Sequence, residues 1–197
     1  MTVPLVFTWP EGAAFWLVSI WFYIPEYRLL RGSTGIKAKS SQDAGSIKLI
    51  VAGGQLGGLA AFLTAFFWSS ATIMVERTGV YWLGIILLIA AGILRRHCFR
   101  MLGESFTGVV LVNANQPIVE RGAYKWIRHP SYSAAYLLYF ALGLVLTNWS
   151  SIIELVVAAI VMYTYRISVE ERVLVENLGD PYVQYQRRTK KLIPFLY

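Results

Sequence analysis

Residues 49–74 read LIVAGGQLGGLAAFLTAFFWSSATIM and contain no charged side chain. A helix needs about 20 consecutive apolar residues to cross the hydrocarbon core of a bilayer, and this segment is long enough to do so. The whole chain of 197 residues has a similar character, with 56% hydrophobic and 15% charged residues, whereas soluble domains average about 45–50% and about 25%. The sequence therefore predicts a polytopic, all-α integral membrane protein.

Four further apolar stretches predict additional transmembrane helices. They cover approximately residues 10–30, 79–94, 132–146 and 152–165. The last two are short and only residues 147–150 separate them, so we expect a tight hairpin whose helices continue past their apolar portions at the open end. The sequence therefore predicts five transmembrane helices in one integrated domain. Residues 1–94 contain the first three helices, and residues 95–197 contain the hairpin and the catalytic region.

The basic residues gather on one side of the predicted membrane. Of 18 Lys and Arg residues, 17 lie between the first and second stretches, between the third and fourth, or after the fifth, and Arg77 alone lies on the other side. Because cytoplasmic loops carry an excess of Lys and Arg, the N-terminus is expected outside and the C-terminus in the cytoplasm. This topology accounts for the net charge of +7, and no nucleic-acid partner is expected.

The second stretch carries a glycine pattern. Residues 53–58, GGQLGG, contain two overlapping small-xxx-small patterns, which let helix backbones approach closely in membranes. The pattern predicts close helix packing, either within the chain or between two copies, and it leaves the oligomeric state open.

Side chains with useful chemistry concentrate in residues 95–128 and 166–197. The polar connection from residue 95 to residue 130 is far longer than the about 2–8 residues that usually join helices, and long connections of this kind are usually functional. A cytoplasmic cofactor-binding region is therefore expected there. Two histidines and one cysteine are too few for an ordinary zinc site, so no metal is expected.

An ordered set of motifs fills this second half of the chain. Residues 121–134 read RGAYKWIRHPSYSA, residues 166–171 RISVEE, residues 178–185 LGDPYVQY and residues 191–195 KLIPF. This set closely resembles the isoprenylcysteine carboxyl methyltransferases and their phospholipid-methyltransferase relatives. Their pattern is G-x-Y, R-H-P-x-Y-x-G, a hydrophobic hairpin, E-E, G-x-x-Y-x-x-Y and a terminal P-F. The resemblance covers roughly residues 90–197, and Ala134 replaces the last glycine of the second motif.

The residues around Pro130 also suit ligand binding by their own chemistry. Proline fits the first turn of a helix, and the free N–H groups and partial positive charge of a helix N-terminus favour a carboxylate such as that of a methionine moiety. Locally, His129 could equally cap the helix and Tyr132 anchor it at the membrane interface. The resemblance implies that His129, Pro130, Ser131 and Tyr132 bind S-adenosylmethionine.

Three charged residues near the motifs have alternative interpretations. The resemblance implies that Glu170 lies near the cofactor's ammonium group and that Arg166 holds the substrate carboxylate, but four-residue spacing also suits a structural ion pair. It likewise implies that Arg95 faces the active site, whereas the positive-inside rule would make it an ordinary membrane anchor. Glu171 is expected to be structural or solvent-facing.

Further cofactor contacts are implied upstream and downstream of the R-H-P motif. Tyr124, the tyrosine of G-x-Y, is expected against the adenosine, and Leu111 to contribute through its backbone or by apolar packing. Contacts made largely through the backbone are implied for Gln116, Pro117, Ile118 and Val119. After Gly179, a typical helix stop, a short helix carrying Tyr182 and Tyr185 is expected as a lid over the cofactor, or alternatively as an amphipathic segment on the membrane surface.

The resemblance implies S-adenosylmethionine-dependent O-methylation of the C-terminal carboxylate of isoprenylated cysteine, or of a similar lipid-linked acceptor that enters laterally from membrane lipid. Such a carboxylate, with a pKa of about 3.3–3.7, is ionised at neutral pH and needs no general base.

Three alternative functions remain. A phospholipid N-methyltransferase would have to remove an ammonium proton. A membrane sterol reductase would bind NADPH. A small transporter or scaffold would place ionisable residues at the membrane midplane, which this sequence does not.

Overall fold

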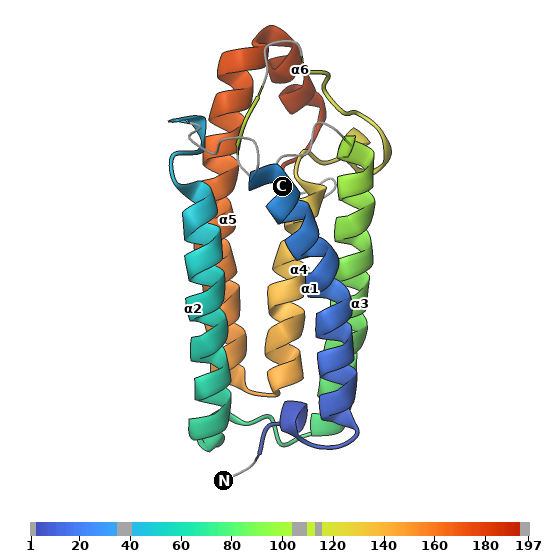
Figure 1. Cartoon of the computed structure of the whole chain (residues 1–197), viewed down its shortest axis with the longest axis vertical. Helices are drawn as coiled ribbons and strands as arrows, with labels where there is room; N and C mark the ends of the chain where they lie inside the picture. Colours follow the sequence, from blue (N-terminus) through green and yellow to red (C-terminus); the bar gives the residue numbers. More distant parts are fainter. Residues whose placement is uncertain (1–2, 35–40, 104–109, 113–115, 194–197) are drawn as a thin grey trace.

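The computed structural model describes residues 3–34, 41–103, 110–112 and 116–193. Within these ranges the chain is helical and contains no strand, as the sequence predicts. The α-helices are α1 (Glu11–Thr34), α2 (Ser46–Phe67), α3 (Arg77–Leu102), α4 (Pro130–Leu146), α5 (Trp149–Leu178) and α6 (Asp180–Arg188). Figure 1 shows α1 to α5 running along the long axis of the molecule, with α6 packed at its upper end.

Three of these helices are long and apolar enough to cross a membrane: α2, α3 and α5. Two apolar helical segments are shorter, namely α4 with 17 residues and the part of α1 from Glu11 to Ile24. Large hydrophobic side chains are exposed along the bundle, among them Leu56, Ile86 and Ile153. An exposed surface of this kind suits hydrocarbon rather than water. The chain is an integral membrane protein, and the count of five crossings stays a prediction.

The second apolar stretch, residues 49–74, supplies a helix long enough to cross a membrane, but it is not helical to its end. Helix α2 ends at Phe67, and the chain continues through the short 3₁₀ helix η3 (Ser69–Ala71) into extended backbone. There the amide of Ile73 donates to the carbonyl of Thr147 at 2.9 Å, and the side chain of Asn148 donates to the carbonyl of Trp68 at 3.1 Å. These hydrogen bonds join the α2–α3 connection to the turn of the α4–α5 hairpin.

The expected hairpin is formed by α4 and α5. Its turn uses Thr147 in a left-handed conformation (φ 50°), and the side chain of Asn148 accepts a hydrogen bond from the amide of Ser151 as an N-cap. At Gly143, a Cβ would lie 2.7 Å from the Cα of Ile152, so only glycine permits this approach of the two helices. As expected, α5 continues well past its apolar portion, and it carries Arg166 and Glu170 with it.

The glycine pattern of α2 packs within the chain. A Cβ at Gly53 would lie 2.6 Å from the sulfur of Met162, and one at Gly57 would lie 3.2 Å from the Cβ of Ala158. Both partners lie on α5. This supports close packing within the chain as the role of Gly53 and Gly57, and not packing against a second copy. Gly58 faces open space.

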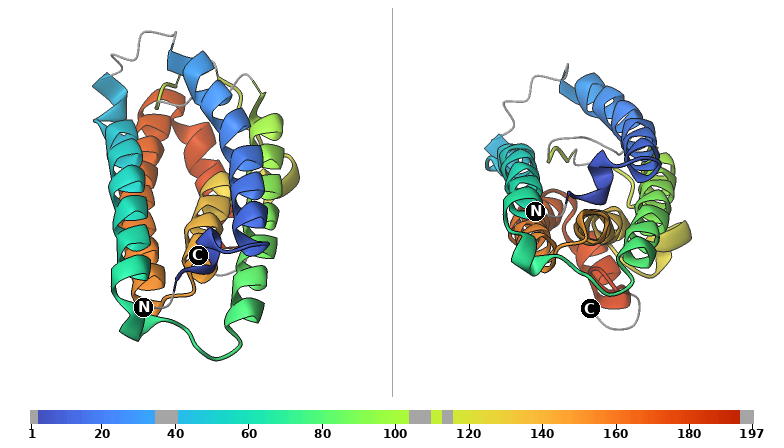
Figure 2. Two further views of the ribbon diagram at one scale, coloured as in Figure 1. Left: turned by 60° about the horizontal axis from the view of Figure 1, so that its bottom comes forward. Right: turned by 90° about the horizontal axis from the view of Figure 1, so that it is seen from below.

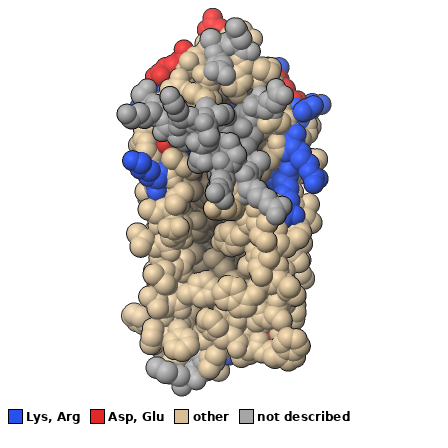
Figure 3. All heavy atoms as spheres, in the orientation of Figure 1, with Lys and Arg blue, Asp and Glu red and all other residues tan. Residues whose placement is uncertain are grey.

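The bundle is open on one side. Viewed from below, α4 lies between α3 and α5, α2 packs on α5, α1 packs on α3, and α1 and α2 stand apart (Figure 2). Side chains of α1 and α2 both line two cavities in this gap, and the space-filling view in Figure 3 is hollowed there. Near the lower end, the rings of Phe15 and Phe62 bring α1 and α2 together at 6.0 Å between centroids. The fold therefore provides a lateral opening whose far end is closed by aromatic side chains.

Candidate active site

A cavity lies where the upper ends of α4 and α5 meet α6 and the long connection between α3 and α4. Its wall includes twelve of the side chains proposed from the sequence: Arg95, Leu111, Gln116, Pro117, Ile118, Val119, Tyr124, His129, Ser131, Tyr132, Arg166 and Glu170. Pro130 does not line the cavity; it is buried as the first residue of α4. Proline there fixes the backbone at the helix start, so its part is to shape the wall.

The R-H-P motif is held by side-chain contacts with α5. His129 is the N-cap residue of α4, but its side chain makes no capping hydrogen bond; its Nε2 atom lies 3.1 Å from Oε1 of Glu171, and its ring stacks on that of Tyr132 at 5.5 Å. Nε of Arg128 donates to the same glutamate oxygen at 2.8 Å. A simple helix cap therefore does not account for the His129 side chain, which lies in the cavity wall between Tyr132 and Glu171.

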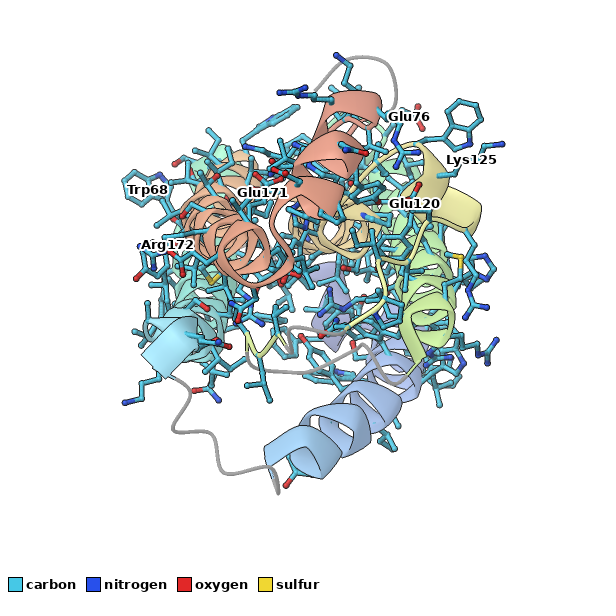
Figure 4. The ribbon with its side chains drawn as sticks, turned by 90° about the horizontal axis from the view of Figure 1, so that it is seen from above. Trp68, Glu76, Glu120, Lys125, Glu171 and Arg172 are labelled. Atoms are coloured by element: carbon cyan, nitrogen blue, oxygen red, sulfur yellow. The ribbon has the colours of Figure 1, made fainter. Side chains whose placement is uncertain are left out.

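Glu171 is a structural residue and not a solvent-facing one. Its side chain is 15% exposed and also lies 3.6 Å from the ammonium of Lys191. Seen from above, Glu171 points inward toward α6, whereas its neighbour Arg172 points outward from α5 (Figure 4). One carboxylate thus joins α5 to the start of α4 and to the segment after α6.

The second charged group on α5 is built around Arg166. Its guanidinium donates to Oδ1 of Asp43 at 2.5 Å and, through Nε, to the hydroxyl of Tyr132 at 3.1 Å. That hydroxyl donates to Oε2 of Glu170 at 2.5 Å. Tyr132 therefore lies between Arg166 and Glu170 and links them, and it is part of the site and not merely a membrane anchor.

Arg95 reaches the same cavity from α3. Its Nη1 atom donates to the carbonyl of Ser131 at 3.1 Å, and its guanidinium lies 4.7 Å from the centre of the Phe99 ring. The side chain thus points from α3 to the first turn of α4. This direction differs from that of an arginine extended into the lipid headgroups.

The tyrosines of α6 close the cavity from above. Tyr182 and Tyr185 are buried and line the cavity, and the hydroxyl of Tyr185 donates to the carbonyl of Tyr124 at 2.6 Å. Burial raises the pKa of both phenols well above its ordinary value, so they are neutral at physiological pH. The preceding glycine, Gly179, ends α5 at φ 61°. The short helix is packed as a cover and not as a free surface segment.

Tyr124 lines the cavity and carries a buried hydroxyl. Within the described part of the chain, this hydroxyl has no hydrogen-bond partner at ordinary distance and angle, although the side chain of Ser131 lies near enough to lower its pKa slightly. Burial raises the pKa of this phenol, so the hydroxyl remains a donor. A buried polar group without a partner costs free energy, and a ligand with an acceptor would supply that partner.

The C-terminal segment supports the site from outside. The amides of Arg128 and His129 donate to the carbonyls of Lys190 and Lys191, at 2.8 and 3.1 Å, and the hydroxyl of Ser133 donates to the carbonyl of Leu192 at 2.5 Å. Pro194 and Phe195, the end of the last motif, lie outside the described residues.

The sequence interpretation missed one buried acidic residue, Asp43. It lies in the 3₁₀ helix η2 (Ser41–Asp43), far from the motifs along the chain, and binds Arg166. A signal existed, because Asp43 is the only acidic residue between Arg28 and Lys48, a stretch that is otherwise basic. The tyrosines at positions 139 and 163, which also line the cavity, were hidden among apolar helix residues.

Comparisons with known proteins agree with the motifs. Residues 83–176 match the isoprenylcysteine carboxyl methyltransferase (ICMT) family. The chain is 30% identical over 115 residues to protein-S-isoprenylcysteine O-methyltransferase B of Arabidopsis thaliana, covering 57% of this chain and 58% of that protein. It is 29% identical over 116 residues to protein-S-isoprenylcysteine O-methyltransferase of Saccharomyces cerevisiae, covering 58% of this chain and 48% of that protein. The chain thus spans about half the length of the curated relatives it matches.

A solved structure shares the fold. The eukaryotic intramembrane Ras methyltransferase ICMT aligns with a TM-score of 0.67 and 21% sequence identity, over 98% of this chain and 70% of that one. The family match itself takes in the R-H-P motif, the α4–α5 hairpin and the glutamate pair. The resemblance seen in the motifs is confirmed: through residues 83–176, this chain is related to the isoprenylcysteine carboxyl methyltransferase family.

Proposed function

We propose that the protein is an S-adenosylmethionine-dependent methyltransferase that esterifies the C-terminal carboxylate of an isoprenylated cysteine, or of a similar lipid-linked acceptor. The observation that carries this proposal is the two-part character of the cavity. Arginines, His129 and Glu170 line one part, and apolar side chains of α1 and α2, including Phe22, Ile50 and Val51, line the other. A substrate with a charged head and a hydrocarbon tail fits such a cavity.

The residues present fit S-adenosylmethionine, which when bound would supply a methyl group on a sulfonium centre. The N-terminus of α4 offers its partial positive charge to the carboxylate, and Glu170 offers a partner for the ammonium. The buried hydroxyl of Tyr124 lacks a partner within the described residues and would find an acceptor on the adenosine. Residues 116–119 line the same wall and would pack along it.

Arg95 and Arg166 would orient the acceptor carboxylate. A guanidinium can hold a carboxylate through two parallel hydrogen bonds, and both arginines line the cavity. Arg166 is held in place by its ion pair with Asp43, and Arg95 by its hydrogen bond to the carbonyl of Ser131. The acceptor is ionised at neutral pH, so the protein needs only to position the reactants and exclude water. Tyr182 and Tyr185, buried over the cavity, would exclude it.

The lipid tail would reach the site through the gap between α1 and α2. Phe22 and Tyr23 of α1 belong to the walls of both cavities in that gap, so the polar site and the apolar groove adjoin. The exposed apolar side chains around the gap would face hydrocarbon, from which a prenyl chain enters without crossing water.

We also propose five crossings, with the N-terminus outside and the site on the cytoplasmic side. Figure 3 supports this orientation, because Lys, Arg, Asp and Glu gather at the upper end of the face shown and the rest of that face is nearly free of them. Tags at the two ends should be accessible from opposite sides of sealed vesicles; access from one side would contradict the proposal.

A methyl-transfer assay tests the function. The purified protein receives methyl-labelled S-adenosylmethionine with a prenylcysteine analogue, with phosphatidylethanolamine, or with no acceptor. The proposal predicts label on prenylcysteine that alkali releases as methanol, since the product is a carboxyl ester. Alkali-stable label on phosphatidylethanolamine would instead indicate an N-methyltransferase. Binding of NADPH, with none of S-adenosylhomocysteine, would indicate a reductase.

A further inference from the structure

Asp43 is a buried carboxylate outside the motifs and outside the matched residues 83–176. It is 5% exposed. Oδ1 accepts hydrogen bonds from Arg166 at 2.5 Å, from the amide of Val110 at 2.9 Å and from the hydroxyl of Ser46 at 3.0 Å. Oδ2 accepts one from the amide of Ile47 at 3.0 Å. Burial alone would raise the pKa of Asp43, but these amides and the Arg166 guanidinium hold it below its ordinary value. The group is therefore an anion at neutral pH.

These contacts join three parts of the molecule that are distant in sequence. Ser46 and Ile47 begin α2, Val110 belongs to the long connection, and Arg166 lies on α5. The neighbouring residue Gln42 adds a second hydrogen bond, accepting from the amide of Val112 at 3.2 Å. Residues 42 and 43 thus hold residues 110–112 against the bundle, and Leu111 of this segment lines the cavity.

Asp43 also fixes the side chain that organises the polar wall. Its bond to Nη1 of Arg166 places Nε of the same guanidinium on the hydroxyl of Tyr132, which in turn donates to Glu170. Removing one partner of a buried ion pair leaves an uncompensated charge. Without Asp43, the guanidinium would turn toward the nearest remaining carboxylate or toward water, and Tyr132 would lose its present orientation.

We propose that Asp43 is a positioning residue of this site: through Arg166 it sets the Tyr132–Glu170 pair, and through Val110 it sets the wall at Leu111. The inference rests on the proposed function, because the pair it orients is the one assigned to the cofactor. Asp43 itself is not part of the cavity wall, so it acts without touching the reactants. A segment of the α1–α2 connection thereby controls the Tyr132–Glu170 pair, which lies in the second half of the chain.

The test compares Asp43→Asn with wild type in S-adenosylhomocysteine affinity, measured by calorimetry on folded protein, and in kcat and KM for the methyl donor. Asparagine keeps the shape but removes the charge. Loss of a charge-assisted hydrogen bond corresponds to an about 10- to 100-fold weaker affinity and a higher donor KM. A merely structural role would reduce only the amount of folded protein, leaving affinity and KM per folded molecule unchanged.

Glu154→Gln is the matched control. Glu154 is also a carboxylate that joins α5 to α2, through a 2.9 Å hydrogen bond from Thr64, but it does not line the cavity. Its replacement should leave affinity and donor KM unchanged. If Asp43→Asn does not fold, Ser46→Ala takes its place, because Ser46 bonds both Asp43 and Arg166, and an about 2- to 10-fold weaker affinity is expected.

The outcomes separate the two proposals. Wild type that binds S-adenosylhomocysteine and methylates prenylcysteine, with unchanged affinity and KM in the Asp43 or Ser46 variant, overturns the positioning role alone. Wild type that does not bind S-adenosylhomocysteine overturns the proposed function and the inference with it.

Discussion

Nε of Arg128 donates to Oε1 of Glu171 at 2.8 Å, across 43 residues of sequence. The same oxygen lies 3.1 Å from His129, while the preceding glutamate, Glu170, accepts from Tyr132. The R-H-P-x-Y motif and the glutamate pair are therefore two halves of one hydrogen-bonded unit. One motif lies at the start of α4 and the other on the far part of α5. The α4–α5 hairpin turns the chain back on itself and so places the two motifs side by side.

Glu171→Gln should destabilise this unit. Loss of charge-assisted hydrogen bonds to Arg128 and His129 is expected to lower the free energy of unfolding by about 1.5–3 kcal/mol. The measurement is thermal unfolding in detergent. Glu176→Gln, an exposed position on the same helix, serves as the control and should change little; equal stability of both variants would contradict the structural role of Glu171.

Arg95→Lys should reduce turnover on prenylcysteine about 10- to 150-fold, since lysine keeps the charge but not the planar fork that holds a carboxylate. Affinity for S-adenosylhomocysteine should stay near the wild-type value, because Arg95 is assigned to the acceptor. Arg100→Lys, in the exposed last turn of α3, is the control. Normal turnover in Arg95→Lys would leave Arg95 as a membrane anchor only.

Tyr124→Phe removes a hydroxyl that has no partner among the described residues. Stability should therefore be unchanged or slightly greater, while affinity for S-adenosylhomocysteine weakens about 2- to 10-fold through one lost hydrogen bond to the ligand. Tyr185→Phe makes the comparison sharp, because that hydroxyl already donates to a carbonyl and its loss should reduce stability. Unaltered affinity in Tyr124→Phe would remove Tyr124 from the ligand contacts.

Phe62→Ala should lengthen the apolar groove. Phe62 lines the second cavity and meets Phe15 where α1 and α2 approach, so its truncation opens the closed end. The ratio of KM for a 20-carbon prenyl acceptor to that for a 15-carbon one should fall relative to wild type. Leu59 is exposed on the same helix, so Leu59→Ala should leave the ratio unchanged. An equal ratio in wild type, Phe62→Ala and Leu59→Ala would argue against binding of the prenyl tail in this groove.

Local patterns in the sequence predict the helices and much of the cavity wall. Apolar length, Pro130 at a helix start, Gly179 at a helix end and the ordered motifs all act over a few residues, so they can be recognised without the fold. The end of α2 could not be predicted in this way. The apolar residues after Phe67 pair with the hairpin turn at Thr147, and that contact exists only in three dimensions.

The direction of a side chain at the end of a helix was equally out of reach. Glu171 was expected to be structural or solvent-facing, because it lies beyond the apolar portion of α5, and only the folded chain shows that the segment after α6 brings Lys191 near it. Asp43 was missed for the opposite reason. Its partner Arg166 is 123 residues away, and no local pattern links a short connection to a helix so remote.

The gap between α1 and α2 has a kinetic consequence. An acceptor that arrives through it is delivered by the bilayer, so the quantity that governs its encounter rate is its mole fraction among lipids and not its amount per volume of solution. Inert lipid or detergent then acts as a two-dimensional diluent. Saturation curves of this protein are comparable between preparations only at a fixed ratio of acceptor to total amphiphile.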